Sequence, residues 1–227
     1  MPVGPDSSPR IMRRALSYSI GALAAASAAD VDRSDDDRTF FKAEKAKLET
    51  IAAALRDADR ALTDFDLGPG TVQQAQVSLG DEVLDRGLRN GNTRTKLALR
   101  GTGGLDATHV FGARVDDLIR APVAREPSLV LDAVARLDHL PDFAEKAAVK
   151  DDLTLRAKQQ EGFLAVRDAG DAEETKLKSV VTKLVVDGAL ALSALRGALE
   201  SRFPRQRVYQ AKFFYEPPRR KQDDSDE

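Results

Sequence analysis

Residues 172–203, AEETKLKSVVTKLVVDGALALSALRGALESRF, carry the apolar pattern that decides the fold. Apolar side chains recur there in steps of three and four residues, the spacing of one face of an α-helix. The main row is Leu177, Val181, Leu184, Ala191, Leu195 and Ala198, and a second row is Val185, Leu192 and Leu199. A face of this width needs two or more neighbouring helices to cover it. The stretch therefore predicts a long helix within a helical bundle.

The composition also favours helices over sheets. Apolar residues make up 42% of the 227 residues, whereas aromatic residues make up only 5% and tryptophan is absent. Such a core has to be built from Ala, Leu and Val, which suits closely packed helices. We expect an all-α fold, an elongated antiparallel helical bundle with long heptad-patterned helices.

Several classes of function conflict with this composition. Without cysteine the chain has no disulfide and no thiolate metal site, and two histidines cannot form a histidine-rich one. The 35 basic and 37 acidic residues give a net charge of −2, so any attraction to nucleic acid or a membrane surface has to be local. No segment approaches the roughly 18 uninterrupted apolar residues that cross a bilayer. We predict no cofactor, no metal ligands and no membrane span.

We expect one bundle domain over residues 10–215, between a flexible lead at residues 1–9 and a disordered charged tail at residues 216–227. Residues 10–29 allow two interpretations. Their arginines and mildly apolar run, with an A-x-A sequence at its end, resemble an export signal that would be cleaved near residue 28. Because polar residues interrupt the run, we favour a retained helix and a cytoplasmic protein. Cleavage would instead imply an exported one.

Turn-forming residues predict where the first long helices end. A helix over residues 34–66 is expected to stop at LGPG, residues 67–70, because glycine ends helices and proline cannot continue them. The next helix, residues 71–89, is expected to stop at NGN, residues 90–92, a sequence that also occurs in β-hairpins.

Two further boundaries are expected in the second half of the chain. Asp106 is expected to cap a helix that ends before Pro122. Residues 168–171, Asp-Ala-Gly-Asp, are expected to reverse the chain between antiparallel helices 142–167 and 172–203, because short links join antiparallel helices.

The segment that covers residues 202–215 changes in character. It holds five of the twelve aromatic residues, interleaved with basic ones. Aromatic residues at the end of a helix commonly close the end of a core, and such a packing role is our first interpretation. A docking surface for a protein partner is the second, and binding of nucleic acid, whose bases stack on aromatic rings, is the third. The candidate docking residues are Arg202, Phe203, Arg205, Arg207, Tyr209, Lys212, Phe213, Phe214 and Tyr215.

None of the other charged groups in the sequence forms a catalytic set. A second basic cluster has acidic neighbours, and two carboxylate groups come nearest to a metal site. The basic cluster is Arg86, Arg89, Arg94, Lys96 and Arg100; the carboxylate groups are Asp138 and Asp142 with His139, and Asp116 and Asp117 with Asp85 or Glu82. The Glu-x-x-His pairs of di-metal helical bundles are absent from the sequence.

We therefore expect a non-enzymatic helical scaffold or protein–protein interaction protein that acts through helix faces and is able to self-associate. An alternative is a module that binds a polyanion or nucleic acid through the two basic clusters. A second alternative is a carboxylate–metal enzyme within a helical bundle, for which the sequence lacks the usual ligand pairs.

Overall fold

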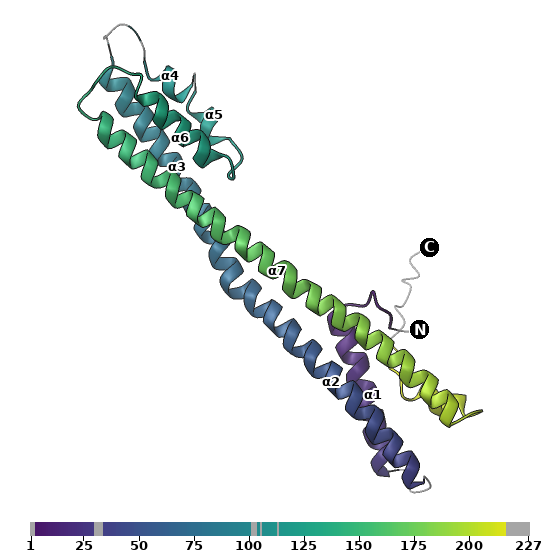
Figure 1. Ribbon diagram of the computed structural model, residues 1–227. Helices are drawn as coiled ribbons and strands as arrows, with labels where there is room; N and C mark the ends of the chain where they lie inside the picture. Colours follow the sequence, from purple (N-terminus) through teal and green to yellow (C-terminus); the bar gives the residue numbers. More distant parts are fainter. Residues whose placement is uncertain (1–2, 30–33, 101–103, 105, 113, 217–227) are drawn as a thin grey trace, which may run out of the picture. The chain divides into compact units, whose positions relative to one another are not determined.

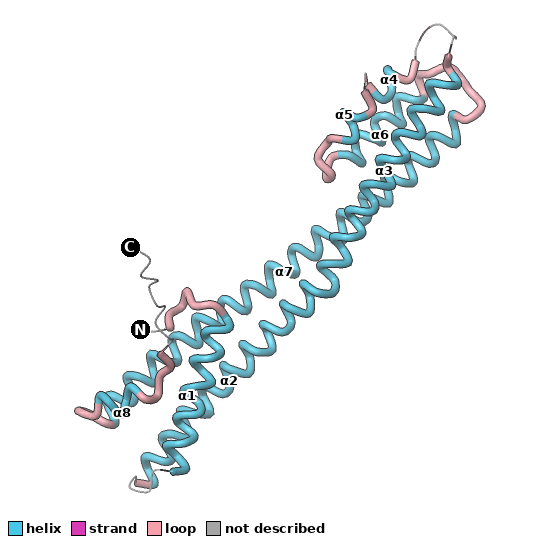
Figure 2. Tube along the Cα trace, turned by 180° about the vertical axis from the view of Figure 1, so that it is seen from behind, coloured by secondary structure: helices cyan, strands magenta, loops and turns pink. Residues whose placement is uncertain are grey.

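The computed structural model describes residues 3–29, 34–100, 104, 106–112 and 114–216, and all regular secondary structure among them is helical. Long helices pack against one another (Figures 1 and 2). In chain order the elements are α1 (Pro9–Ala29), α2 (Asp35–Phe65), the π-helix η1 (Asp66–Gly70), α3 (Thr71–Ala98), α4 (Thr108–Phe111), α5 (Asp116–Ile119), α6 (Glu126–Leu137), α7 (Lys146–Arg202) and α8 (Arg207–Ala211). The predicted all-α class is confirmed for these residues.

The backbone forms two compact units, each with its own apolar core. The first unit comprises the chain up to Asp64 and from Glu174 onward, and the second comprises Phe65–Glu173. Helix α7 contributes residues to both. The prediction of a single domain over residues 10–215 concerns how cooperatively the chain folds, and it stays a prediction.

In the first unit, α1 and α2 lie beside the C-terminal part of α7 (Figure 1). The predicted apolar residues of α2 are buried at intervals of seven: Phe41, Leu48 and Leu55. On α7 the second predicted row, Val185, Leu192 and Leu199, is buried throughout, whereas the main row is only partly so. The predicted face is therefore correct, but its centre lies on the second row.

The N-terminal residues also contribute to the first core. Met12, Leu16 and Leu23 on α1 are fully buried, four and seven residues apart, which places them on one side of the helix. Of the predicted flexible lead, residues 3–8 include a turn, and Val3 is buried in the same core. The predicted tail lies outside the described residues, except for residue 216.

In the second unit, α3 packs against α6 and the N-terminal part of α7 (Figure 2). Contacts between α3 and α7 pair Gln73 with Gly170, and Gly91 with Val149. Residue numbers rise along α3 as they fall along α7, so these two helices run in opposite directions. Their core is Leu84 and Leu88 on α3, Val110 and Phe111 on α4, Val130, Ala133 and Leu137 on α6, and Val149, Leu153 and Ala157 on α7.

The predicted chain reversal at residues 168–171 is wrong, because α7 is helical without interruption from Lys146 to Arg202. The segment contains no proline, and a glycine inside a helix costs only about 1 kcal/mol. Gly170 is buried, and a Cβ atom there would overlap Oε1 of Gln73. The glycine thus makes room for the Gln73 side chain of α3 and does not form a turn. The predicted 142–167 helix is the first part of α7 and begins at Lys146.

The predicted helix end at NGN is also wrong. At LGPG, α2 does end within one residue of the prediction, at Phe65, but the expected loop is wrong. Residues 66–70 form η1, so no loop separates α2 from α3. Proline has no backbone N–H for the hydrogen bond that each residue of an α-helix donates four positions back. In a π-helix the backbone hydrogen bonds instead reach five positions back, so the bonding register around Pro69 is shifted by one residue. The Thr71 hydroxyl donates a hydrogen bond to the Asp66 carbonyl at 2.7 Å. Helix α3 continues to Ala98, and Gly91 is buried where a Cβ atom would lie 3.3 Å from Leu153 Cδ1.

The expected helix between Asp106 and Pro122 is divided into α4 and α5. Gly112 separates them with a φ of 75°, a backbone conformation that favours glycine. Asp106 does act at the start, because its Oδ1 accepts a hydrogen bond from the Thr108 backbone N–H at 2.8 Å.

The continuity of α7 leads to a first testable prediction. Replacing Gly170 with alanine should raise the free energy of unfolding by up to about 1 kcal/mol, because alanine favours a helix and the flexible Gln73 side chain can move aside. Urea unfolding of both chains measures the change. Gly162→Ala, at an exposed position of α7 with open space around it, is the matched control. A loss of stability in Gly170→Ala alone would show that the Gln73 side chain is fixed against Gly170 and cannot move aside.

Candidate functional site

The aromatic side chains of residues 202–215 lie mainly in the first core. Phe203 and Phe213 are 4% and 3% exposed, and each stacks on Phe41 of α2 with ring centroids 5.6 Å apart. Tyr209 meets both rings edge-on, at 5.6 and 5.2 Å. The rings of Phe203 and Phe213 are consequently covered and do not offer a stacking surface to a ligand.

Polar contacts fix the backbone of this segment. The fully buried Ser19 donates a hydrogen bond to the Phe213 carbonyl at 2.7 Å, and the Gln210 amide donates one to the Phe203 carbonyl at 2.7 Å. Arg202 forms an ion pair with Asp37 at 2.7 Å, where α7 ends and α2 begins. The segment is held to α1, α2 and α7, so its outward-facing residues are presented on a rigid base.

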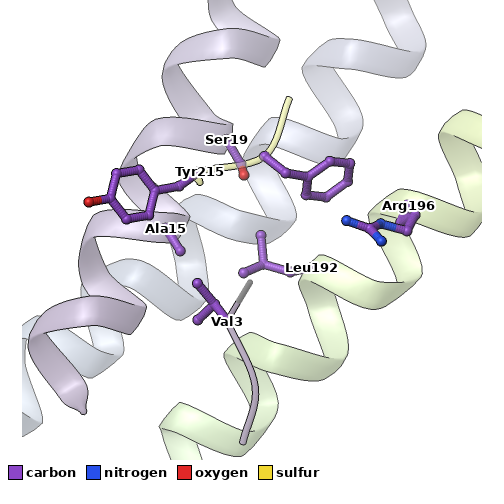
Figure 3. A pocket seen from close by; sticks show the side chains of 7 residues that line it. Val3, Ala15, Ser19, Leu192, Arg196 and Tyr215 are labelled. Carbon is purple, nitrogen blue, oxygen red and sulfur yellow. The ribbon is translucent and has the colours of Figure 1, made fainter. Parts of the chain in front are cut away.

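A small cavity of about 20 Å³ lies between α1, α7 and the end of this segment (Figure 3). Leu192 and Val3 lie at its centre, with Arg196 and Tyr215 on opposite sides. Its lining is mostly apolar, and the hydroxyl of Ser19 is already bonded to the backbone. A space of this size admits about one water molecule and leaves no room for a substrate.

The two last aromatic residues carry cations on their rings. The Arg196 guanidinium lies 4.8 Å from the ring centre of Phe214. Arg14 lies 5.8 Å from that of Tyr215 and donates a hydrogen bond to its hydroxyl at 3.3 Å. These cation–π contacts are worth about 0.5–1 kcal/mol each at exposed sites.

The remaining basic residues of the segment point away from the core. Arg205, Arg207 and Lys212 are exposed, and none forms an ion pair with another described residue. Arg205 and Arg207 line two adjoining hollows: Arg196, Glu200 and Phe214 help to line one, and Val208 and Lys212 the other. Arg205 has a φ of 73°, which costs a non-glycine residue about 1–2 kcal/mol. We call Arg205, Arg207, Val208 and Lys212 the basic hollow.

The second basic cluster is largely neutralised. Arg86 pairs with Glu82 at 3.3 Å, and Arg89 pairs with Asp85 at 3.6 Å. Arg94 pairs with Glu145. These contacts leave Lys96 and Arg100 without a carboxylate partner among the described residues, too few to form a polyanion site.

Of the predicted carboxylate groups, that of Asp138 and Asp142 is likewise occupied, whereas Asp116 and Asp117 are exposed on α5. Asp138 binds Lys150, which lowers the pKa of the Asp138 carboxyl, and Asp142 pairs with Lys146 at 3.2 Å. The His109 Nδ1 accepts a hydrogen bond from the Asp106 backbone N–H. Across the described residues, no three His, Asp or Glu side chains meet in an arrangement that could hold a metal ion.

A buried acidic group in the second unit was not predicted. Glu126 is 1% exposed at the start of α6 and faces Asp81 and Asp85 of α3. Neither of its oxygens, nor Oδ1 of Asp85, has a hydrogen-bond donor. Burial, followed by these neighbouring carboxyls, raises the pKa of Glu126 to about 9, and burial raises the pKa of Asp85. The sequence Glu-Pro reads as an ordinary helix start, so nothing in it signals this burial.

Comparisons with known proteins find no match, neither among family models nor among curated proteins or solved structures. Among the helices that the structure describes, none combines the length and apolar character needed to cross a membrane. Function therefore has to be argued from the contacts and surfaces above.

Proposed function

We propose that the protein is a non-enzymatic helical scaffold that acts through protein–protein contacts and self-associates. The observation that carries this proposal is a set of large apolar side chains left exposed on α3 and α7 of the second unit. Val72 and Leu79 of α3 are 55% and 66% exposed, and Leu155 and Val166 of α7 are 58% and 48% exposed. We call these four residues the apolar face.

The spacing of these residues supports a contact surface. Val72 and Leu79 are seven residues apart, two helical turns, and Leu155 and Val166 are eleven apart, three turns. Each pair thus lies on one side of its helix. Apolar residues at such intervals are typical of helices that pair with other helices.

A second copy of the chain is a suitable occupant. A symmetric dimer uses the same patch twice, so one set of four side chains supplies both halves of the interface. Burying apolar surface contributes about 25 cal/mol per Å², which has to exceed the loss of freedom on association. We therefore expect reversible association that depends on concentration.

The proposal extends to the arrangement of the helices. It takes them as an antiparallel bundle with heptad-patterned seams, supported by the opposite directions of α3 and α7 and by the buried residues at intervals of seven on α2. It also takes residues 10–29 as retained and the protein as cytoplasmic. Support for retention comes from α1, whose removal would strip Met12, Leu16 and Leu23 from the first core.

The test is light scattering coupled to size exclusion over about a hundredfold range of concentration. We expect the mass to rise with concentration, and the double variant Val72→Lys/Leu79→Lys to stay monomeric, because charges on the apolar face oppose its burial. Leu190→Lys, at an α7 position of the first unit that is 64% exposed, is the control and should associate like the unchanged chain. A strict monomer throughout, or equal masses for all three chains, would refute self-association through this face.

A second candidate function, binding of an anion, is supported by a different observation, the unpaired cations of the basic hollow.

A further inference from the structure

The basic hollow concentrates positive charge that the molecule does not neutralise. Arg205, Arg207 and Lys212 find no carboxylate partner among the described residues, although ion pairs are frequent on the helices around them. Glu200, which lines one of the two adjoining hollows, does not pair with them. A chain with a net charge of −2 has ample carboxylates, so this local excess leaves the surface complementary to an anion.

The hollow is also prepared for binding. Its backbone is anchored by the stacked rings of Phe203 and Phe213 on Phe41 and by the hydrogen bond from Ser19. Arg205 keeps its left-handed backbone conformation within this anchored segment. A ligand therefore meets side chains whose attachment points are already ordered, which reduces the entropy lost on binding.

An exposed apolar side chain lies among the cations. Val208 is 77% exposed and lines the same hollow as Arg207 and Lys212. Guanidinium groups bind carboxylates in a bidentate manner. An apolar group beside them favours a ligand that carries both negative charge and an apolar side chain.

These observations favour a peptide over a nucleic acid. Single-stranded nucleic acid is held by stacking on exposed aromatic rings, yet Phe203 and Phe213 are covered and Phe214 is overlaid by Arg196. Tyr209 also lines one of the hollows, but its ring packs edge-on against Phe203 and Phe213. A protein segment needs no such rings, because Asp and Glu meet the arginines and an apolar residue meets Val208. We propose that the basic hollow binds an acidic segment of a partner protein, with carboxylates on Arg205, Arg207 and Lys212 and an apolar side chain on Val208.

The experiment uses the full chain and a fluorescent synthetic peptide of Asp and Glu with one central Leu, followed by anisotropy. We expect saturable binding that weakens with salt, and a loss of affinity of roughly tenfold or more in Arg205→Ala/Arg207→Ala/Lys212→Ala. Arg86→Ala/Lys96→Ala/Arg100→Ala removes the same charge elsewhere and should bind within about twofold of the unchanged chain. Val208→Ser should weaken binding by about threefold, because only the apolar contact is lost.

Three outcomes would overturn the proposal. The first is no binding of the peptide, and the second is equal loss in both triple variants, which would show an unspecific effect of charge. The third is tighter binding of a single-stranded oligonucleotide that depends on the same three cations, which would assign the surface to nucleic acid. Circular dichroism of each variant checks that the helices are intact, so that loss of binding is not loss of fold.

Discussion

Replacing Glu126 with glutamine should stabilise the protein by about 1–3 kcal/mol at neutral pH, because it removes a buried group whose charged form is unfavourable. In the fold, Glu126 faces Asp81 and Asp85 and lacks a donor for either oxygen. The glutamine amide has the same shape and supplies two N–H donors to these carboxyls. The substitution thus removes a buried acid and provides hydrogen-bond donors for the neighbouring carboxyls.

The effect should depend on pH in a defined direction. The pKa of Glu126 is about 9 in the fold and 4.5 for the ordinary carboxyl, so between these values the folded chain holds a proton that the unfolded chain has lost. Stability contributed by this proton is complete below pH 4.5, falls as pH rises, and is lost above the folded pKa. The raised pKa of Asp85 acts with the same sign. At most, the shift is worth about 6 kcal/mol at 1.36 kcal/mol per unit.

Urea unfolding from about pH 5 to about pH 9 measures this dependence. The unchanged chain should lose stability across the range, whereas Glu126→Gln should lose much less. Glu161→Gln, which removes an exposed carboxylate from α7 in the same unit, should follow the unchanged chain. Parallel curves for the Glu126→Gln and unchanged chains would show that Glu126 is ionised and solvated in the fold.

The sequence predicted which residues are buried better than it predicted where helices end. Periodicity reports the side of a helix that faces a core, and Phe41, Leu48 and Leu55 are buried as expected. Glycine and proline report only a local tendency to turn. Gly91 and Gly170 instead serve close helix contacts, and Pro69 is accommodated by the π-helix. Whether glycine ends a helix or admits a neighbour depends on tertiary packing, which local sequence does not contain.

For the candidate site, too, the sequence predicted the segment but not how tertiary packing arranges its side chains. Composition singled out residues 202–215, but it could not separate the rings that close the core from the cations that face outward. That separation depends on Phe41, far away in sequence, on whose ring both Phe203 and Phe213 stack. The sequence does not reveal the burial of Glu126, because this burial results from α3 packing over the start of α6.

Replacing Phe41 with alanine should cost about 3–5 kcal/mol, the usual loss for removing a fully buried phenylalanine. The substitution leaves a cavity and also removes the ring on which Phe203 and Phe213 stack, at centroid distances of 5.6 Å. Urea unfolding gives the loss in stability, and hydrogen exchange of amides in residues 207–213 reports loosening of the segment. Phe40→Ala, at the neighbouring half-buried ring, is the control and should cost clearly less.

This substitution also links the fold to the proposed docking site. If the stacked rings hold the basic hollow in place, Phe41→Ala should weaken binding of the acidic peptide under conditions where the protein is still folded, although no cation is altered. A loss of stability below about 1 kcal/mol would contradict the packing described for Phe41. Unchanged peptide affinity together with faster exchange at residues 207–213 would show that the cations bind without an ordered base. A single unfolding transition reported from both units is the result that the predicted single domain requires.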